Sequence, residues 1–177
     1  LQEVVMKKKP IYLYVLLGLE TVGTLWELIS KFSSSNDAVE SLLKGMEEPV
    51  KSQFATYFSK SAELSGSLLS NVFFYASLLL LIAAWFFVFK KDIFKANLIY
   101  IAGILIGLIG TAYSYVAAKG IAASSFSDPT LLSTQILGLN MSVGFSVVLS
   151  LIFLSIVVFK LIKQQKEAET VEVAEEE

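Results

Sequence analysis

Four long apolar runs, separated by shorter polar gaps, dominate the hydrophobic pattern of this chain. The runs cover residues 11–32, 70–89, 97–118 and 137–159. A helix needs about 20 apolar residues to cross a hydrocarbon core about 30 Å thick. Each run meets or approaches that length, so the pattern predicts an all-α integral membrane protein built as a four-transmembrane-helix bundle.

Lysine is concentrated at alternate ends of these runs. One cluster precedes the first run, a second fills the gap between the second and third, and a third follows the fourth: Lys7–Lys9; Lys90, Lys91 and Lys95; Lys160, Lys163 and Lys166. If every run crosses a membrane, all three clusters lie on one side, as is typical of cytoplasmic segments. We therefore expect a multi-pass protein of the plasma membrane with both termini cytoplasmic.

The boundaries of the remaining segments follow from this topology. Cytoplasmic segments are expected at residues 1–10, 90–96 and 160–177, and extracytoplasmic segments at residues 33–69 and 119–136. Residues 1–5 precede a plausible initiator, Met6, and are interpreted as a cloning remnant. The last segment changes from Lys-rich to Glu-rich, which predicts disorder or a frayed helical extension.

The first extracytoplasmic segment carries two short amphipathic patterns. Apolar residues recur at helical spacing from Val39 to Met46, and again after Pro49, where a second helix can begin. Two interpretations are open: a surface that binds a partner or lipid headgroups, or a lid folded onto the end of the bundle. The lid is favoured, because an amphipathic pattern by itself indicates only that one face is buried.

Composition narrows the available chemistry. The chain contains no Cys and no His, and all 14 basic residues are lysine. It therefore lacks thiolate chemistry, the commonest general base and the bidentate guanidinium clamp. We expect a non-catalytic protein without a cofactor or metal site, and a net charge of −2 gives no argument for nucleic-acid binding. An all-lysine, Cys-free chain also fits the codon bias of an AT-rich bacterial genome.

Two of the runs carry stripes of small residues at helical spacing. The third run has Gly103, Gly107, Gly110 and Ser114, and the fourth has Gly138, Ser142, Ser146 and Ser150. Small side chains allow membrane helices to approach each other closely. The stripes are therefore predicted to pack the helices of the bundle, and oligomerisation through the same stripes is the alternative.

One ionisable residue lies deep in the first run. Glu20 follows Pro10 by ten residues, which places it about 15 Å into the membrane. The residues that continue its helical stripe include Glu27 and Lys31, which are spaced for an ion pair. Polar residues of the fourth run lie at similar depths. The candidate site for a ligand or an ion comprises Glu20, Thr24, Glu27, Asn140 and Ser146.

Three roles for Glu20 remain open. It specifies helix pairing as a protonated or hydrogen-bonded group, it binds a cation, an amine or a lipid headgroup, or it relays a proton or an ion. Polar residues gather in the extracytoplasmic halves of the runs. This asymmetry favours a cavity that opens outward and is closed on the cytoplasmic side.

These features together predict a small accessory or partner-binding subunit of an envelope or transport complex, acting through its outer half. The alternative is a small transporter, or a lipid- or amphiphile-binding protein, that uses the stripe of Glu20 and Glu27. The expected partners are the lipid bilayer and either a partner protein or a second copy of the chain. A lipid or small amphiphile is the candidate ligand.

Overall fold

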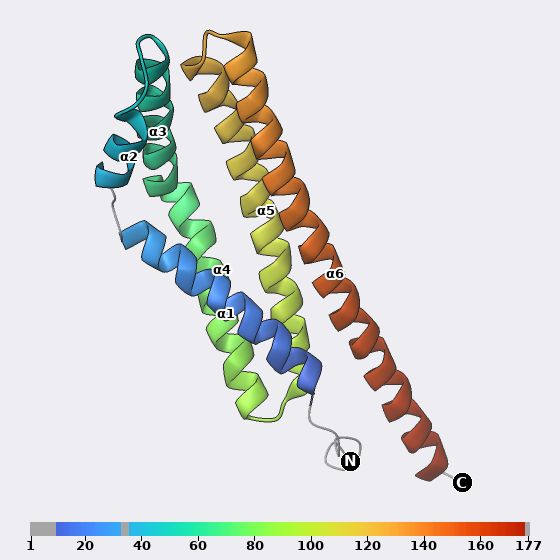
Figure 1. Ribbon diagram of the computed structural model, residues 1–177. Coiled ribbons are helices and arrows are strands. Elements are labelled where there is room, and N and C mark those ends of the chain that lie inside the picture. Colours follow the sequence, from blue (N-terminus) through green and yellow to red (C-terminus); the bar gives the residue numbers. More distant parts are fainter. Residues whose placement is uncertain (1–9, 33–35, 176–177) are drawn as a thin grey trace.

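The computed structural model describes residues 10–32 and 36–175, and this part of the chain is helical without strands (Figure 1). The helices are α1 (Ile11–Phe32), α2 (Asn36–Leu43), α3 (Val50–Gly66), α4 (Leu68–Phe89), α5 (Ile93–Ser125) and α6 (Pro129–Glu175). The expectations for residues 1–9, including the first lysine cluster, and for residues 33–35 lie outside the described residues.

Four of the helices, α1, α4, α5 and α6, are long and apolar enough to cross a membrane. The mean hydropathy of an 18-residue window within each helix ranges from 1.3 in α1 to 2.6 in α6. Many of their large apolar side chains are exposed, among them Trp26, Leu79, Ile109 and Phe145. A soluble protein rarely presents so much apolar surface on its long helices. The all-helical class and the four long apolar helices are thus confirmed.

The helices α4 and α5 form an antiparallel hairpin, and α6 packs along α5 (Figure 1). The hairpin turns at Lys90–Asp92, where Lys91 has a left-handed φ of 61°. The Lys91 N–H donates to the Val88 carbonyl and the Asp92 N–H donates to the Phe87 carbonyl. This pair of bonds is a Schellman motif, which satisfies the last carbonyl groups of α4. The Asp92 side chain then caps α5 by accepting from the Lys95 N–H.

The main apolar core lies at the end of the molecule that contains this hairpin turn. It combines Leu13, Leu16 and Leu17 of α1 with side chains of α4, α5 and α6. Among the latter, Val88, Ala96 and Val157 are almost completely buried. The helix α1 crosses α4 obliquely (Figure 1) and is joined to it by a hydrogen bond from the Trp85 Nε1–H to the Thr21 hydroxyl at 3.0 Å.

Both α5 and α6 extend beyond the apolar runs of the sequence. Only Phe126–Asp128 separate them, although residues 119–136 were predicted as an extracytoplasmic loop. Lysine and serine end a hydrophobic run, but neither residue ends a helix. The Asp128 carboxylate accepts hydrogen bonds from the N–H groups of Thr130 and Leu131, which caps the first turn of α6. At its other end α6 continues to Glu175.

The helix α3 covers the corner between α5 and α6 (Figure 1). Its Tyr57 lies in a second apolar cluster with Ala122 and Phe126. The Gln135 side-chain amide donates to the Tyr57 hydroxyl at 2.8 Å, and the Ser127 N–H donates to the Gln53 side chain at 2.9 Å. These contacts hold α3 against the end of α5 and the start of α6, and a lid at the outer end of the bundle stays a prediction.

Candidate functional site

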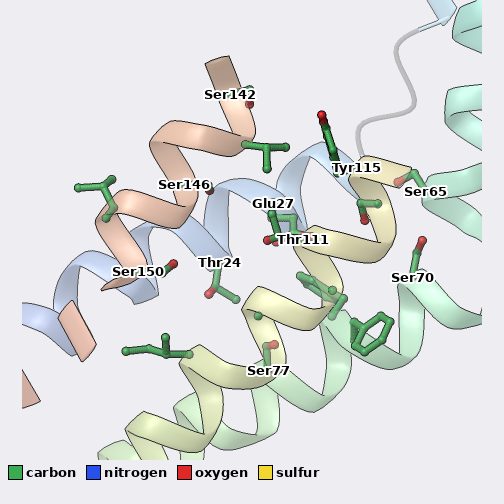
Figure 2. A pocket seen from close by; sticks show the side chains of 18 of the residues that line it. Thr24, Glu27, Ser65, Ser70, Ser77, Thr111, Tyr115, Ser142, Ser146 and Ser150 are labelled. Atoms are coloured by element: carbon green, nitrogen blue, oxygen red, sulfur yellow. The ribbon is translucent and has the colours of Figure 1, made fainter. Parts of the chain in front are cut away.

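A cavity of about 1090 Å³ lies between α1, α4, α5 and α6, with residues of α3 at one end (Figure 2). Its walls combine apolar side chains with an unusual number of hydroxyl groups. The hydroxyl-bearing residues are Thr24, Tyr57, Ser61, Ser65, Ser70, Ser77, Tyr100, Thr111, Ser114, Tyr115, Ser142, Ser146 and Ser150. The cavity reaches the size of pockets that bind small organic ligands.

The helix α1 supplies the charged groups of the cavity. Glu20, Thr24, Glu27 and Lys31 all line it, because their spacing places them on one face of the helix. Glu20 is partly buried, whereas Glu27 is exposed. The stripe read from the sequence is therefore brought together along one wall, with its two carboxyl groups about 10 Å apart along the helix axis.

Lys31 does not form the predicted ion pair with Glu27. Its Nζ donates to the Ser65 carbonyl oxygen at 2.9 Å and to the Asn71 Oδ1 at 2.8 Å, and it lies 5.2 Å from the ring centroid of Phe74. The predicted ion pair is therefore wrong, because α1 is positioned so that Lys31 lies beside the junction of α3 and α4. Glu27 keeps only a longer-range attraction to the Lys31 ammonium group.

Glu20 lies close enough to Tyr100 of α5 for the two groups to interact electrostatically. Tyr100 is only 3% exposed. Tyr100 is one of the residues that line the cavity. Its hydroxyl oxygen is buried and has no hydrogen-bond partner of good geometry in the described part of the chain, although it interacts with Glu20. A buried hydroxyl group without a partner is costly and calls for an explanation. The pair of Glu20 and Tyr100 forms the deep end of the cavity, next to the apolar core.

The small residues of α5 line the same cavity. All four predicted members of the stripe, Gly103, Gly107, Gly110 and Ser114, contribute to its wall. A Cβ atom added at Gly110 would lie 3.1 Å from the Phe73 Cβ, so α4 approaches closely there. At Gly107 such an atom would meet nothing within 4 Å among the described residues. The stripe therefore borders both a tight helix contact and an open space.

The serine stripe of α6 faces the cavity as well. Figure 2 shows Ser142, Ser146 and Ser150 following one another along α6, opposite Thr24 and Thr111. Gly138, the first predicted member of this stripe, does not line the cavity and has open space around its Cβ position. Packing through this position stays a prediction.

Asn140 is the one residue of the candidate ligand site that does not line the cavity. Its Oδ1 instead accepts a hydrogen bond of 2.6 Å from the hydroxyl group of Tyr115, which does line it. Asn140 thus orients a wall residue rather than facing the cavity itself.

Tyr100 was missed from the sequence because a tyrosine within an apolar run reads as part of that run. The glycine stripe contained a usable signal. Extending its helical period backward from Gly103 leads to Tyr100, one turn deeper along α5.

A hydrogen-bond network closes the end of the molecule beyond the core. The Tyr12 hydroxyl donates to the Asn97 Oδ1 at 3.0 Å, and the Asn97 Nδ2 donates to the Gln164 Oε1 at 3.2 Å. Asn97 is completely buried. The network joins α1, α5 and α6. Both the apolar core and this hydrogen-bond network therefore lie between the cavity and the end of the molecule at the hairpin turn.

Comparison with known proteins gives one match. A family model with the description Domain of unknown function (DUF8777) matches residues 6–170, which include all six helices almost in full. The chain belongs to this family. Comparisons with curated proteins and with solved structures gave no match.

Proposed function

We propose that the chain is a multi-pass protein of the plasma membrane, a four-helix bundle with both termini cytoplasmic. The distribution of lysine supports this orientation. The lysines of the hairpin turn and those that follow the apolar part of α6 gather at the same end, where Gln164 contacts Asn97. Such an end is typically retained in the cytoplasm.

Because the chain has no cysteine, single cysteines can report this topology with a membrane-impermeant thiol reagent. Ser59 of α3 and Lys90 of the hairpin turn are both exposed. Intact cells should label Ser59→Cys and should label Lys90→Cys only after lysis. The reverse pattern would invert the topology.

Within that membrane arrangement, the function best supported by the geometry is binding of a small organic ligand in the cavity. The observation that carries this proposal is a cavity of about 1090 Å³ whose lining includes the Glu20 carboxyl group and Tyr100, whose buried hydroxyl group makes no hydrogen bond of good geometry to a described residue. A cavity that served only as imperfect packing would be apolar and small. The hydroxyl-rich walls and the charged stripe give a ligand specific contacts.

The binding role is proposed to be non-catalytic. Glu20 and Glu27 lie two helical turns apart, so they are poorly placed to act on one bond. No group of three possible metal ligands of the His, Cys, Asp or Glu type occurs in the described ranges. The cavity supplies contacts for recognition rather than a paired acid and base.

Filling the cavity tests this proposal. Gly107→Phe places a ring in the open space of the cavity wall, and Gly144→Phe is the matched control, since its Cβ also meets nothing within 4 Å but lies away from the cavity. The protein is exposed to a total membrane extract, reconstituted in nanodiscs and analysed by native mass spectrometry. A bound molecule should appear in the wild type and the control and be lost in Gly107→Phe. No bound molecule, or equal retention by all three proteins, refutes the proposal.

A second candidate is an accessory subunit that binds a partner protein. The observation in its favour is the sparse packing of α6, of whose apolar span only 6% is buried within the chain. Among the described residues of α6, Val157 is the one fully buried apolar side chain. Chemical crosslinking from single cysteines at Met141 and Phe145, which are exposed on this helix, tests this candidate. Crosslinking to lipid alone contradicts it.

A further inference from the structure

The cavity carries one carboxyl group that forms no ion pair with a lysine of the described residues. The two ion pairs found in the described residues join Lys95 to Asp92 and Lys163 to Glu167, and neither involves the cavity. Glu27 is attracted to Lys31, which is one helical turn away. Glu20 is partly buried, and its polar neighbour in the described part of the chain is the uncharged hydroxyl of Tyr100 rather than a lysine. One carboxyl group at the deep end is therefore available to pair with a cationic ligand.

The Tyr100 hydroxyl supplies the second contact at this end. A phenolic oxygen both donates and accepts hydrogen bonds, and here neither capacity is used with good geometry. An ammonium group placed between the two side chains would donate to the Glu20 carboxylate and to the Tyr100 oxygen. Hydrogen bonds of this kind, between charged partners, are the strong ones.

The rest of the cavity indicates what else the ligand contains. A bare ion occupies a small fraction of 1090 Å³. The deep end is bordered by the apolar side chains of Ile104, Leu149 and Phe153. An alkyl chain attached to the ammonium group would be removed from water along these side chains, which is favourable in proportion to the apolar area buried.

We infer that the cavity binds a monocationic amphiphile with a primary amine head, held between Glu20 and Tyr100, and an alkyl tail along the apolar wall. This inference rests on the proposed ligand-binding function and names its ligand class. A neutral amphiphile leaves the carboxylate of Glu20 without a counter-charge. The charged side chains that line the cavity are Glu20, Glu27 and Lys31, so one ammonium group balances their charges when both carboxyl groups are ionised.

Octylamine and octan-1-ol are suitable probes, because they share a chain length and differ in the head group. Binding to the full-length protein in phosphatidylcholine nanodiscs is measured by isothermal titration calorimetry, with empty nanodiscs as the reference. We expect octylamine to bind at least about tenfold more tightly than octan-1-ol, as expected for hydrogen bonds to a charged group. Glu20→Gln should abolish this preference, and Tyr100→Phe should reduce it severalfold. Glu63→Gln is the control and should leave the preference intact, because Glu63 is an exposed carboxyl group of α3 that does not line the cavity.

The possible results distinguish a failure of the amine inference from a failure of the proposed ligand-binding function. If both probes bind equally and both are lost in Gly107→Phe, the cavity binds ligands but the amine inference is wrong. A preference that survives Glu20→Gln also overturns it, because the charge would then be recognised elsewhere. If neither probe binds the wild type, the amine inference is wrong. This holds even if a molecule from the membrane extract binds in the cavity.

Discussion

Two alanine substitutions on one face of α5 give the sharpest test of the packing described above. Gly107 and Gly110 lie three residues apart, in the same helix and at a similar depth. In a helix interior, Gly→Ala typically stabilises by about 0.5–1 kcal/mol, because alanine loses less backbone freedom on folding. At Gly107 the new Cβ meets nothing within 4 Å, so Gly107→Ala should show this gain undiminished.

At Gly110 the new methyl group would lie 3.1 Å from the Phe73 Cβ and 3.2 Å from its Cγ. These two atoms are attached close to the α4 backbone, so they move only if the helix moves. Overpacking of this kind costs about 1–3 kcal/mol, which exceeds the gain in helix propensity. Gly110→Ala should therefore be less stable than the wild type, and about 1–3 kcal/mol less stable than Gly107→Ala.

Thermal unfolding in a mild detergent, followed by circular dichroism, measures the comparison. For a chain of this length, 1 kcal/mol corresponds to a shift in Tm of about 2–4 °C. The two variants should thus differ by several degrees, on opposite sides of the wild type. Equal Tm values, or a lower value for Gly107→Ala, would show that α5 is rotated differently from the arrangement described here.

Three further predictions concern the end of the molecule with the hairpin turn. Lys91→Gly should stabilise the protein by up to about 1 kcal/mol, because glycine adopts the φ of 61° without steric cost; a lower Tm would contradict this. The hydrogen bond and charge of Lys95 lower the pKa of Asp92, so this group stabilises the fold above its unfolded pKa and the effect is lost as pH falls through the lowered value. The Tm difference between the wild type and Asp92→Asn should accordingly vanish on acidification, and a difference that grows at low pH would refute it. Asn97→Leu should cost about 1–3 kcal/mol in detergent unfolding, because it removes two interhelical hydrogen bonds and strands the Tyr12 hydroxyl, whereas an unchanged Tm would show that the network is dispensable.

The positions of the four long helices could be predicted because hydrophobic runs of this length leave few alternatives. The face of α1 that carries Glu20, Thr24 and Glu27 was also predictable, since helical spacing alone places these residues together. Helix ends were harder to predict. Lys119 and the serines after it end an apolar run, yet they remain helical up to Ser125.

Contacts between helices depend on crossing angles, which the sequence does not encode in a readable form. From its spacing, Lys31 was expected to pair with Glu27. Because the α3–α4 junction lies beside α1, Lys31 bonds instead to Ser65 and Asn71. The same applies to the glycine stripe, where Gly110 meets Phe73 and Gly107 meets nothing within 4 Å. Spacing identifies which residues share a face, but tertiary geometry decides what that face meets.

The buried Asn97 side chain has a consequence for the orientation of α5 about its own axis. It bonds to α1 through Tyr12 and to α6 through Gln164 at the same time, which fixes the angle at which α5 presents its side chains. Each residue advances a helix by about 100°, so a slip of one position would turn Tyr100 well away from Glu20. The hydrogen bonds of Asn97 therefore determine the direction in which Tyr100, about one turn further along α5, points. A substitution at Asn97 is therefore expected to move Tyr100 away from Glu20 without contacting either residue.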